Sequence, residues 1–350
     1  MKPASLITIL TLALGAAAPW LISSYELSLL GRFLAFSLVA LGIMLTWGEG
    51  GILSLGQGVF FGLGGYALAM NLKLAGLNLA NGDMPDFMQW SGVSALPGFW
   101  YPFANPWFSL VCVVLVPGIF AAAFSWLVFR RRIGGVYFAL ITQALALAFA
   151  TLLVSEQAFT GGFNGLTDFS TFAGHDITSQ GAARVIYLIT FLLVVASYFF
   201  LRWLLGTRFG TMLRATRDGE NRVRFLGHNP LPYKVVAFTL AGMLSGMGGA
   251  LFTLHAGVIS PALVGVVPSI EMVVWVAVGG RNVLWGAIAG TLLVNFAKDE
   301  ISSALPSLWL YALGGLFILA VSFLPGGIAG LFTTPRMPRF FQRRRQEAAE

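Results

Sequence analysis

The sequence predicts an all-α, polytopic membrane protein with about ten transmembrane helices and both termini in the cytoplasm. Of its 350 residues, 57% are hydrophobic and only 10% are charged, and the mean hydropathy is +0.81. These values lie outside the range of soluble globular proteins and inside that of membrane proteins. Apolar runs long enough to cross the hydrocarbon, roughly 20 residues each, recur along the chain. We therefore predict one transmembrane domain over residues 1–335 and a basic cytoplasmic tail over residues 336–350.

Ten apolar runs are candidate spans. They cover residues 6–22, 28–46, 51–73, 107–129, 134–154, 184–205, 235–256, 268–280, 283–298 and 307–324. The eighth run is too short for a full crossing, so we predict a broken or half-spanning helix there. The first run also fits a signal peptide, because the small residues Ala16–Ala18 resemble a cleavage site. Since many apolar runs follow it, we interpret it as a retained span.

The basic residues predict the orientation of these spans. When the spans alternate across the membrane, one side receives 17 of the 21 lysines and arginines, all except Arg32, Lys73, Arg184 and Lys298. By the positive-inside rule this side is cytoplasmic, and both termini lie on it. The net charge of +7 does not indicate a nucleic-acid partner, because the basic residues sit at the ends of apolar runs rather than along one polar face.

The third span carries polar residues among glycines, in the order Ser54-Leu55-Gly56-Gln57-Gly58. A helix that glycines break at membrane depth needs protein or a water-filled cavity to satisfy its freed backbone groups, and such helices often form substrate sites. Ser54 and Gln57 are therefore candidates for a solute pathway. The alternative is that the glycines here, like Gly242 and Gly246 of the seventh span, only allow helices to pack closely.

Glu271 is a carboxylate within an apolar run, for which two interpretations stay open. It lines a pathway, as charged groups in membrane helices often do, or it caps a helix that begins near Pro268 and Ser269. The spans show no evident cationic mate for Glu271, which argues for a neutral solute. The weaker pathway candidates are Gln143, Asn164 and Asn295, because a hydrogen bond between helices accounts for each equally well.

The motifs of common enzymes are absent. The sequence has no G-x-x-x-x-G-K-[ST], so it cannot bind ATP with a P-loop, and it has no G-x-S-x-G or H-E-x-x-H. Its three histidines show no metal-ligand spacing, and the single Cys112 allows neither a disulfide nor a cysteine metal site. We therefore predict a chain that is not an enzyme and that holds no cofactor or metal.

The segment Arg202–Lys234 is a polar island with seven basic residues and two acids. Its apolar positions predict a short helix, a polar turn around Asp218 and Gly219, and a second short helix. The island either lies on anionic lipid, where each basic side chain gains about 1 kcal/mol, or docks on a cytoplasmic protein. Docking is favoured because the island also carries acids and apolar residues, which a protein groove binds and lipid headgroups do not.

Two outer segments, Gly76–Pro106 and Ser155–Ala183, are rich in turn residues and aromatics. They are either connecting loops with interfacial aromatic residues or a platform for an extracytoplasmic partner. Both interpretations stay open at this point.

Six stretches of the sequence follow a pattern that is typical of one family of membrane proteins. They read WGEGGILSLGQGVFFGLGGYALAM, RRRIGGVYFALITQALALAF, FTGGFNGLTDF, RFGTMLRATRDGENRVRFLG, EMVVWVAVGGRNVLWGAIAG and LLVNFAKDEISSALPSLWLYALGGLFILAVSFLPGGIAG. Together they resemble the membrane subunits of ABC importers in the branched-chain amino acid (LivM-like) group, and within it the urea permease subunits of the UrtC type. The resemblance runs in the same order from about the second span to Gly330. The chain departs from the usual pattern at Gln57, where the group usually has His, and at Gly162-Phe163-Asn164-Gly165, where it usually has Gly-Asn-Asn-Gly.

The resemblance implies a bacterial inner-membrane permease that pairs with a second, related permease. Two cytoplasmic ATPases, which bind ATP and Mg, would drive the importer, and a periplasmic solute-binding protein would deliver urea. The loop 206–234 would be the segment that couples to an ATPase. Its candidate coupling residues are Arg208, Arg214, Arg217, Asp218, Glu220, Arg222 and Phe225.

Two other hypotheses remain. The same importer carries branched-chain amino acids or short amides instead of urea, or the chain is a stand-alone channel or secondary transporter. Ion-coupled carriers also use broken helices and intramembrane acids. A stand-alone carrier, however, does not need a long inner docking segment.

Overall fold

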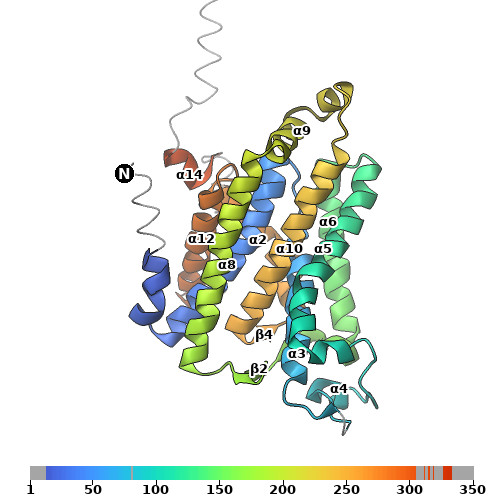
Figure 1. Ribbon diagram of the computed structural model, residues 1–350, viewed down its shortest axis with the longest axis vertical. Helices are drawn as coiled ribbons and strands as arrows, with labels where there is room; N and C mark the ends of the chain where they lie inside the picture. The colour runs from blue at the N-terminus through green and yellow to red at the C-terminus, as the bar shows by residue number, and fades with distance from the viewer. Residues whose placement is uncertain are drawn as a thin grey trace, which may run out of the picture.

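The computed structural model describes residues 13–79 and 82–304, residues 311, 314, 315 and 318, and the segment 326–332. Within these residues, long helices run side by side, and the short strands lie at one end of the bundle (Figure 1). Six helical segments are long and apolar enough to cross a membrane: Ser24–Glu49, Pro106–Arg130, Val136–Ser155, Gln180–Gly206, Leu231–Ala256 and Pro261–Gly279. The structure thus confirms a polytopic helical membrane protein. Part of the predicted first span and most of the predicted last span lie outside the described residues, so the count of ten and the location of the termini stay predictions.

Helix α2 (Ser24–Ile43) begins with a capping box and ends in an irregular turn. The Ser23 side chain accepts a hydrogen bond from the backbone of Glu26, and the Glu26 carboxylate accepts one from the backbone of Ser23, which satisfies N–H groups that have no partner inside the helix. The helix continues as the π-helix η1 (Met44–Glu49). π-Helical turns are rare and often occur at functional sites.

Helix α3 (Gln57–Leu74) does not continue from η1. Residues 51–54 and residue 56 form no regular structure, and Gly56 is the N-cap of α3. The predicted third span is therefore helical only from Gln57, and its first residues, 51–56, are unwound; Gly58, on the other side of Gln57, lies inside α3.

Helix α10 (Leu231–Ala256) packs against α2, α3 and α5 (Pro106–Arg130) in the core of the bundle. Small residues make this close packing possible. A Cβ on Gly64 of α3 would collide with the backbone of Gly246 on α10, and one on Gly249 would collide with the backbone carbonyl of Phe61. This supports the interpretation of these glycines as helix-packing residues.

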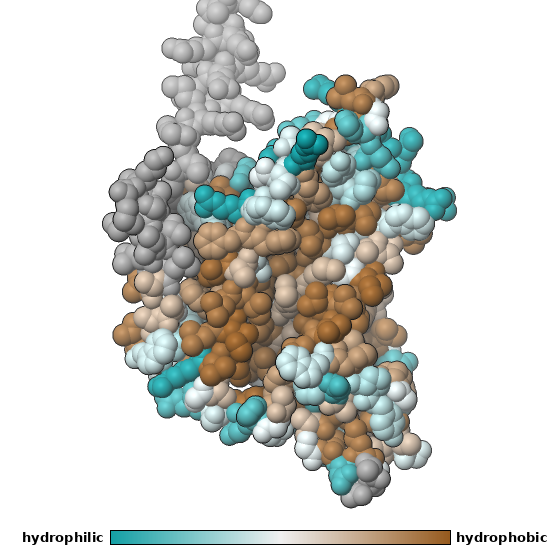
Figure 2. Space-filling model, viewed as in Figure 1, coloured by the Kyte–Doolittle hydropathy of each residue, from teal (hydrophilic) through white to brown (hydrophobic). Residues whose placement is uncertain are grey.

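Helices α5, α6 (Val136–Ser155) and α8 (Gln180–Gly206) expose large apolar side chains on their outer faces, including Leu147, Ile119 and Leu192. Figure 2 shows hydrophobic side chains across the middle of the bundle and hydrophilic ones toward both ends. Such a band is what a bilayer or a membrane partner covers.

The two ends of the bundle differ. One end carries α9 (Arg208–Phe225), which lies across the ends of α2, α8 and α10 (Figure 1); we call it the inner end, following the orientation predicted from the basic residues. The outer end carries the short helices α4 (Asp86–Trp90), η3 (Tyr101–Ala104), α7 (Gln157–Thr160) and η4 (Gly162–Asn164). Strand β1 (Leu166–Thr167) pairs there with β4 (Val258–Ile259), and β2 (Thr171–Phe172) pairs with β3 (His175–Asp176).

After β4, the chain forms η5 (Pro261–Leu263), α11 (Val266–Gly279), α12 (Leu284–Ala304) and, further on, α14 (Gly327–Phe332). With 14 residues, α11 is about 21 Å long. Helix α11 alone is therefore shorter than the hydrocarbon is thick, but together with η5 it forms the segment Pro261–Gly279, which is long enough to cross a membrane. The predicted half-spanning helix is thus not confirmed.

Candidate functional site

The buried start of α3 is the centre of the candidate pathway. Gln57 is the first residue of α3 and is fully buried. Its Oε1 accepts a hydrogen bond from the Ser245 hydroxyl of α10 at 3.1 Å, and its Nε2 has no hydrogen-bond partner within the described chain. The same hydroxyl also donates to the Ala241 carbonyl at 2.8 Å. Since it is the one partner of the Gln57 amide within the described residues, one polar atom of this amide stays unpartnered in either orientation of the side chain. Such a buried atom is available to a solute or a water.

Side chains from two other helices satisfy the backbone that the break sets free. The Leu55 N–H donates to Thr142 Oγ1 of α6 at 3.0 Å, and the Gly58 N–H donates to Ser269 Oγ of α11 at 3.1 Å. This is the compensation that an interrupted helix needs at membrane depth. We call Gln57, Thr142, Ser245 and Ser269 the neutral centre, because four helices bring them together and none is charged.

Glycines allow these helices to approach the break. A Cβ at position 56 would collide with the carbonyl oxygen of Thr142, and one at position 58 would collide with the carbonyl oxygen of Val264. Gly56 and Gly58 are therefore required for the close contact of α3 with α6 and with the chain before α11. The glycines that predicted an interrupted helix thus also allow α6 and the chain before α11 to contact the start of α3.

The other pathway candidates lie at different places. Ser54 is buried in the unwound segment, and its hydroxyl accepts a bond from the Gly56 N–H at 3.4 Å. Gln143 is half-buried on α6, next to Thr142. Asn164 is exposed in η4 at the outer end. Asn295 is buried on α12 and donates to Thr291 of the same helix at 2.8 Å, so the structure does not bring it to Gln57.

Glu271 has a cationic partner, which the sequence analysis did not find. Lys298 of α12 donates to Glu271 Oε2 at 2.7 Å, and the Glu271 side chain is buried. Glu271 also does not cap α11, because the helix begins at Val266 and has no acid in its first turn. Both the capping interpretation and the argument from a missing mate are therefore wrong. The pairing could not be found from spacing, since the two residues lie on different helices.

The ion pair lies away from the neutral centre. Ser269 faces α3, where it binds Gly58, whereas Glu271 faces α12. Two residues along a helix turn the side-chain direction by roughly 200°. The Glu271–Lys298 pair therefore does not bring a charge into the neutral centre, whose own four side chains are uncharged.

Helix α9 has the predicted two-part form. Gly219 has φ −174° and ψ 76°, so the helix is kinked there, and the predicted turn around Asp218 and Gly219 is confirmed. The hydrogen bond from Arg217 and its positive charge lower the pKa of the Asp218 carboxyl.

The first half of α9 is fastened to the end of η1. Arg214 Nη1 lies 3.1 Å from Glu49 Oε2, and Arg217 Nη1 donates to the Gly48 carbonyl at 2.6 Å. We call Gly48, Glu49, Arg214 and Arg217 the inner junction. Sequence reasoning assigned the two arginines to an ATPase contact and missed Glu49. The signal was a lone carboxylate between glycines, in WGEGG, at the inner end of a span.

The second half of α9 offers an exposed surface. Glu220 binds Arg224 at 2.7 Å and also binds Lys234 of α10; burial raises its pKa, but these hydrogen bonds and charges outweigh burial and lower it. Phe225 at the tip is 92% exposed. Arg208 and Arg222 are exposed and form no ion pair within the described residues.

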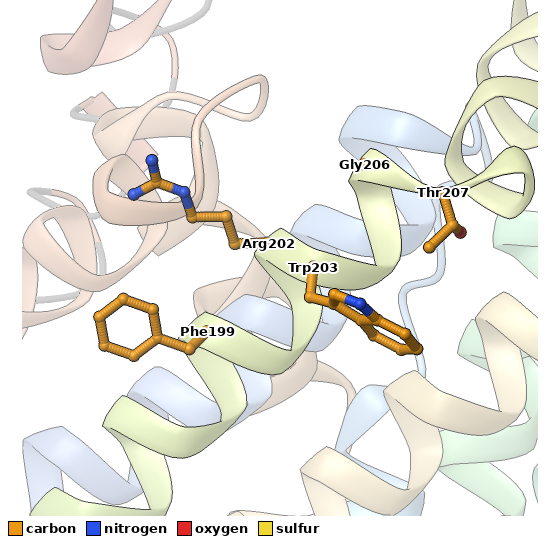
Figure 3. Close-up of a pocket in the computed structure, with 5 residues that line it drawn as sticks. All are labelled: Phe199, Arg202, Trp203, Gly206 and Thr207. Atoms are coloured by element: carbon orange, nitrogen blue, oxygen red, sulfur yellow. The ribbon is translucent and has the colours of Figure 1, made fainter.

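A shallow hollow of about 490 Å³ lies at the inner end of α8. Its lining residues are Phe199, Arg202, Trp203, Gly206 and Thr207. Figure 3 shows that Arg202 and Trp203 point to different sides of the helix rather than toward one point. The hollow contains no residue of the neutral centre, so we do not assign the solute to it.

Comparison with known proteins identifies related transport proteins. The family described as "Branched-chain amino acid transport system / permease component" matches residues 25–322. The high-affinity branched-chain amino acid transport permease LivM of Salmonella typhimurium is 26% identical over 349 residues, which cover 93% of this chain and 75% of the relative. LivM of Escherichia coli K12 has the same identity and coverage over 352 residues.

A more distant match is the autoinducer 2 import system permease LsrC of Escherichia coli O9:H4. It is 32% identical over 135 residues, which cover 36% of this chain and 39% of the relative. No solved structure matches significantly. With six apolar helices among the described residues, the chain is a multi-pass protein of the bacterial inner membrane.

Proposed function

Since this chain belongs to the family of branched-chain amino acid transport system permease components, we propose that it is the membrane subunit of an ATP-driven ABC importer for a small neutral solute, urea first among them. It is not itself an enzyme; the energy comes from partner ATPases, because the sequence has no P-loop. It forms half of the solute pathway beside a second, related permease.

The neutral centre carries the proposal for the solute. Its polar groups are an amide and three hydroxyls, and one atom of the buried Gln57 amide has no partner within the described residues. The three hydroxyls already donate to backbone carbonyls of their own helices, so the unpartnered Gln57 atom is the group open to a solute. Urea offers both N–H donors and a carbonyl acceptor, so it pairs with either atom of this amide without bringing a charge into the membrane. An unpaired charge there costs a few kcal/mol, which disfavours a zwitterion at this place.

A second candidate solute is a branched-chain amino acid or a short amide. Similarity to LivM over 93% of the chain favours it, and the Glu271–Lys298 pair supplies both signs of charge near the centre of the bundle. A zwitterion would have to compete with the pair's own bond at 2.7 Å. For this reason we place urea before the amino acids.

The exposed half of α9 carries the proposal for coupling. Phe225 is a large apolar side chain at a polar tip, flanked by the free guanidinium of Arg222. An apolar anchor with charges around it is the usual composition of a protein contact. We assign it to one of two cytoplasmic ATPases that bind ATP and Mg, and we assign delivery of the solute to a periplasmic binding protein.

Uptake by the reconstituted importer tests the function. The chain is co-expressed with the second permease, the ATPases and the binding protein, and the complex is placed in liposomes with labelled urea or labelled leucine. We expect uptake of urea that requires ATP inside and binding protein outside. Uptake of leucine without urea would establish the second candidate. Uptake of urea by the permeases alone, without ATPase, would show a channel or secondary transporter.

A further inference from the structure

We propose that Glu49 is the positioning residue through which α9 moves the broken start of α3 and thereby sets the state of the neutral centre. The inference rests on the proposed function, since it needs an ATPase that moves α9. It concerns a residue that the sequence analysis named neither as a pathway candidate nor as a coupling residue.

The first step is the contact between α9 and η1. The Glu49 carboxylate is almost fully buried and pairs with Arg214 at 3.1 Å, while Arg217 binds the adjacent Gly48 carbonyl at 2.6 Å. Arg214 also donates to the Leu205 carbonyl of α8 at 3.1 Å. One guanidinium therefore joins three elements, and the first half of α9 holds two consecutive residues of η1.

The second step is the tightness of this contact. Gly51 has φ +69°, and a Cβ on it would lie 2.8 Å from Cγ of Arg217; a Cβ on Gly50 would lie 3.3 Å from the buried Leu213. Closely packed groups transmit displacement instead of absorbing it. A shift of α9 must therefore shift residues 48–51 as well.

The third step is the chain that leads from the junction to the centre. Gln57 follows Glu49 by eight positions, and the segment between them is not helical. Its backbone has no helical ladder; among its bonds are those from Ile52 N–H to the Thr46 carbonyl at 2.8 Å and from Leu55 N–H to Thr142 at 3.0 Å. Ile52 and Ser54 are buried, so this short packed segment passes a displacement on to its far end, the residue that carries the unpartnered amide.

The fourth step is a contact with α11. The guanidinium of Arg281, in the turn between α11 and α12, lies 5.4 Å from the ring centre of Trp47, and a Cβ on Gly48 would collide with the Arg281 carbonyl. Helix α11 also supplies Ser269 to the neutral centre. The inner junction thus contacts both chain segments that enter the centre, and its displacement changes the distance between them.

Charge variants of the pair test the inference in the assembled importer. Glu49→Gln removes the charge and keeps the shape, and Glu49→Arg combined with Arg214→Glu restores a pair of opposite sign. Asp299→Asn and Arg131→Ala are the controls, since they remove an exposed acid and an exposed base outside the junction and outside the island Arg202–Lys234. The measurements are complex yield, thermal stability, ATP hydrolysis with and without loaded binding protein, and uptake.

For Glu49→Gln we expect normal assembly and normal hydrolysis without solute. Stimulation by loaded binding protein, and uptake, should fall by about tenfold or more, as is typical when coupling between two sites is lost. The reversed pair should recover most of both, and the controls should match the wild type. A mere structural role would lower yield and stability and leave the stimulated-to-basal ratio unchanged.

Two outcomes would overturn the inference. One is a Glu49→Gln importer with wild-type stimulation and uptake; the other is loss of assembly in both Glu49→Gln and the reversed pair. A wild-type complex without ATP-dependent uptake would instead reject the proposed function, so the two failures are distinguishable. Recovery by the reversed pair supports the inference even where Glu49→Gln alone does not assemble.

Discussion

The neutral centre and the inner junction lie on one stretch of chain, eight positions apart, yet they are built from different chemistry. The centre pairs Gln57 with Ser245 and backbone amides with hydroxyls, all buried. The junction pairs Glu49 with Arg214, whose side chain is 38% exposed. At the membrane surface water solvates part of a guanidinium, whereas at membrane depth a charge must be fully matched by protein. The centre thus uses uncharged hydrogen bonds, whereas the junction uses an ion pair with a partly exposed guanidinium.

The Glu271–Lys298 pair shows what a charge requires inside the bundle. Glu271 is buried on α11, and its partner reaches it from α12 at 2.7 Å. The two charges compensate one another, and they lie on the side of α11 that faces away from Ser269. The neutral centre therefore differs from the junction and from this pair in one respect: it holds no charged side chain.

The most severe test of the comparison is Gln57→Glu, which places a carboxylate in the neutral centre. A buried charge without a partner costs about 3–5 kcal/mol, so we expect uptake to fall by roughly a hundredfold or more. The measurement is labelled urea uptake by the reconstituted importer. Gln57→Asn, which keeps the amide, is the matched control. Wild-type uptake by Gln57→Glu would show that the centre is wet and outside the solute path.

A second pair of variants tests whether apolar burial or ionic contact holds the ATPase on α9. Phe225→Ser removes the exposed ring, and anchors of this kind are worth about 2 kcal/mol, or about thirtyfold in affinity. We expect the ATPase to be lost from the purified complex. Arg222→Ala should weaken retention less, and mainly at low salt, because exposed charges are screened. The reverse order of effects would make the contact ionic.

Glu271→Gln tests whether the Glu271–Lys298 pair contributes to protein stability rather than to transport. It leaves Lys298 without its carboxylate, and we expect the free energy of unfolding to fall by about 1–3 kcal/mol. Because the pair faces away from Ser269, uptake per assembled complex should be unchanged. Thermal denaturation of the detergent-solubilised protein and uptake normalised to protein give the two readings. A large loss of uptake at wild-type stability would put Glu271 in the solute path.

The smallest effect concerns pH at the inner end. The carboxyls of Asp218 and Glu220 have pKa values lowered in the folded protein, so the stability that they contribute is complete above their unfolded pKa, about 4. It is lost only as the pH falls through the lower folded values. We expect limited proteolysis at the α9 kink to be constant from pH 7 to pH 5 and to increase below about pH 4. An increase near pH 6 would contradict the assignment of these pairs.

Much of the local structure follows from the sequence. The runs predicted at 107–129, 184–205 and 235–256 are helices α5, α8 and α10, with ends that differ by a few residues, because the hydrophobic requirement of a span is a property of the segment itself. The breaks before Gln57 and at Gly219 were also predicted, since glycine lowers the cost of leaving the helix at those positions. Chemistry along the chain was enough for these features.

Only the tertiary structure decided which groups meet. Glu271 of α11 pairs with Lys298 of α12, and Glu49 pairs with Arg214, which lies 165 positions later in the chain. Such pairs depend on how each helix is rotated and which helix lies beside it, and glycine contacts such as that of Gly56 with Thr142 determine both. The spacing of residues within one helix does not show which other helix lies beside it. The sequence by itself thus determined several of the helical runs and the turn at Gly219; helix packing decided which uncharged side chains meet at Gln57 and that Glu49 pairs with Arg214.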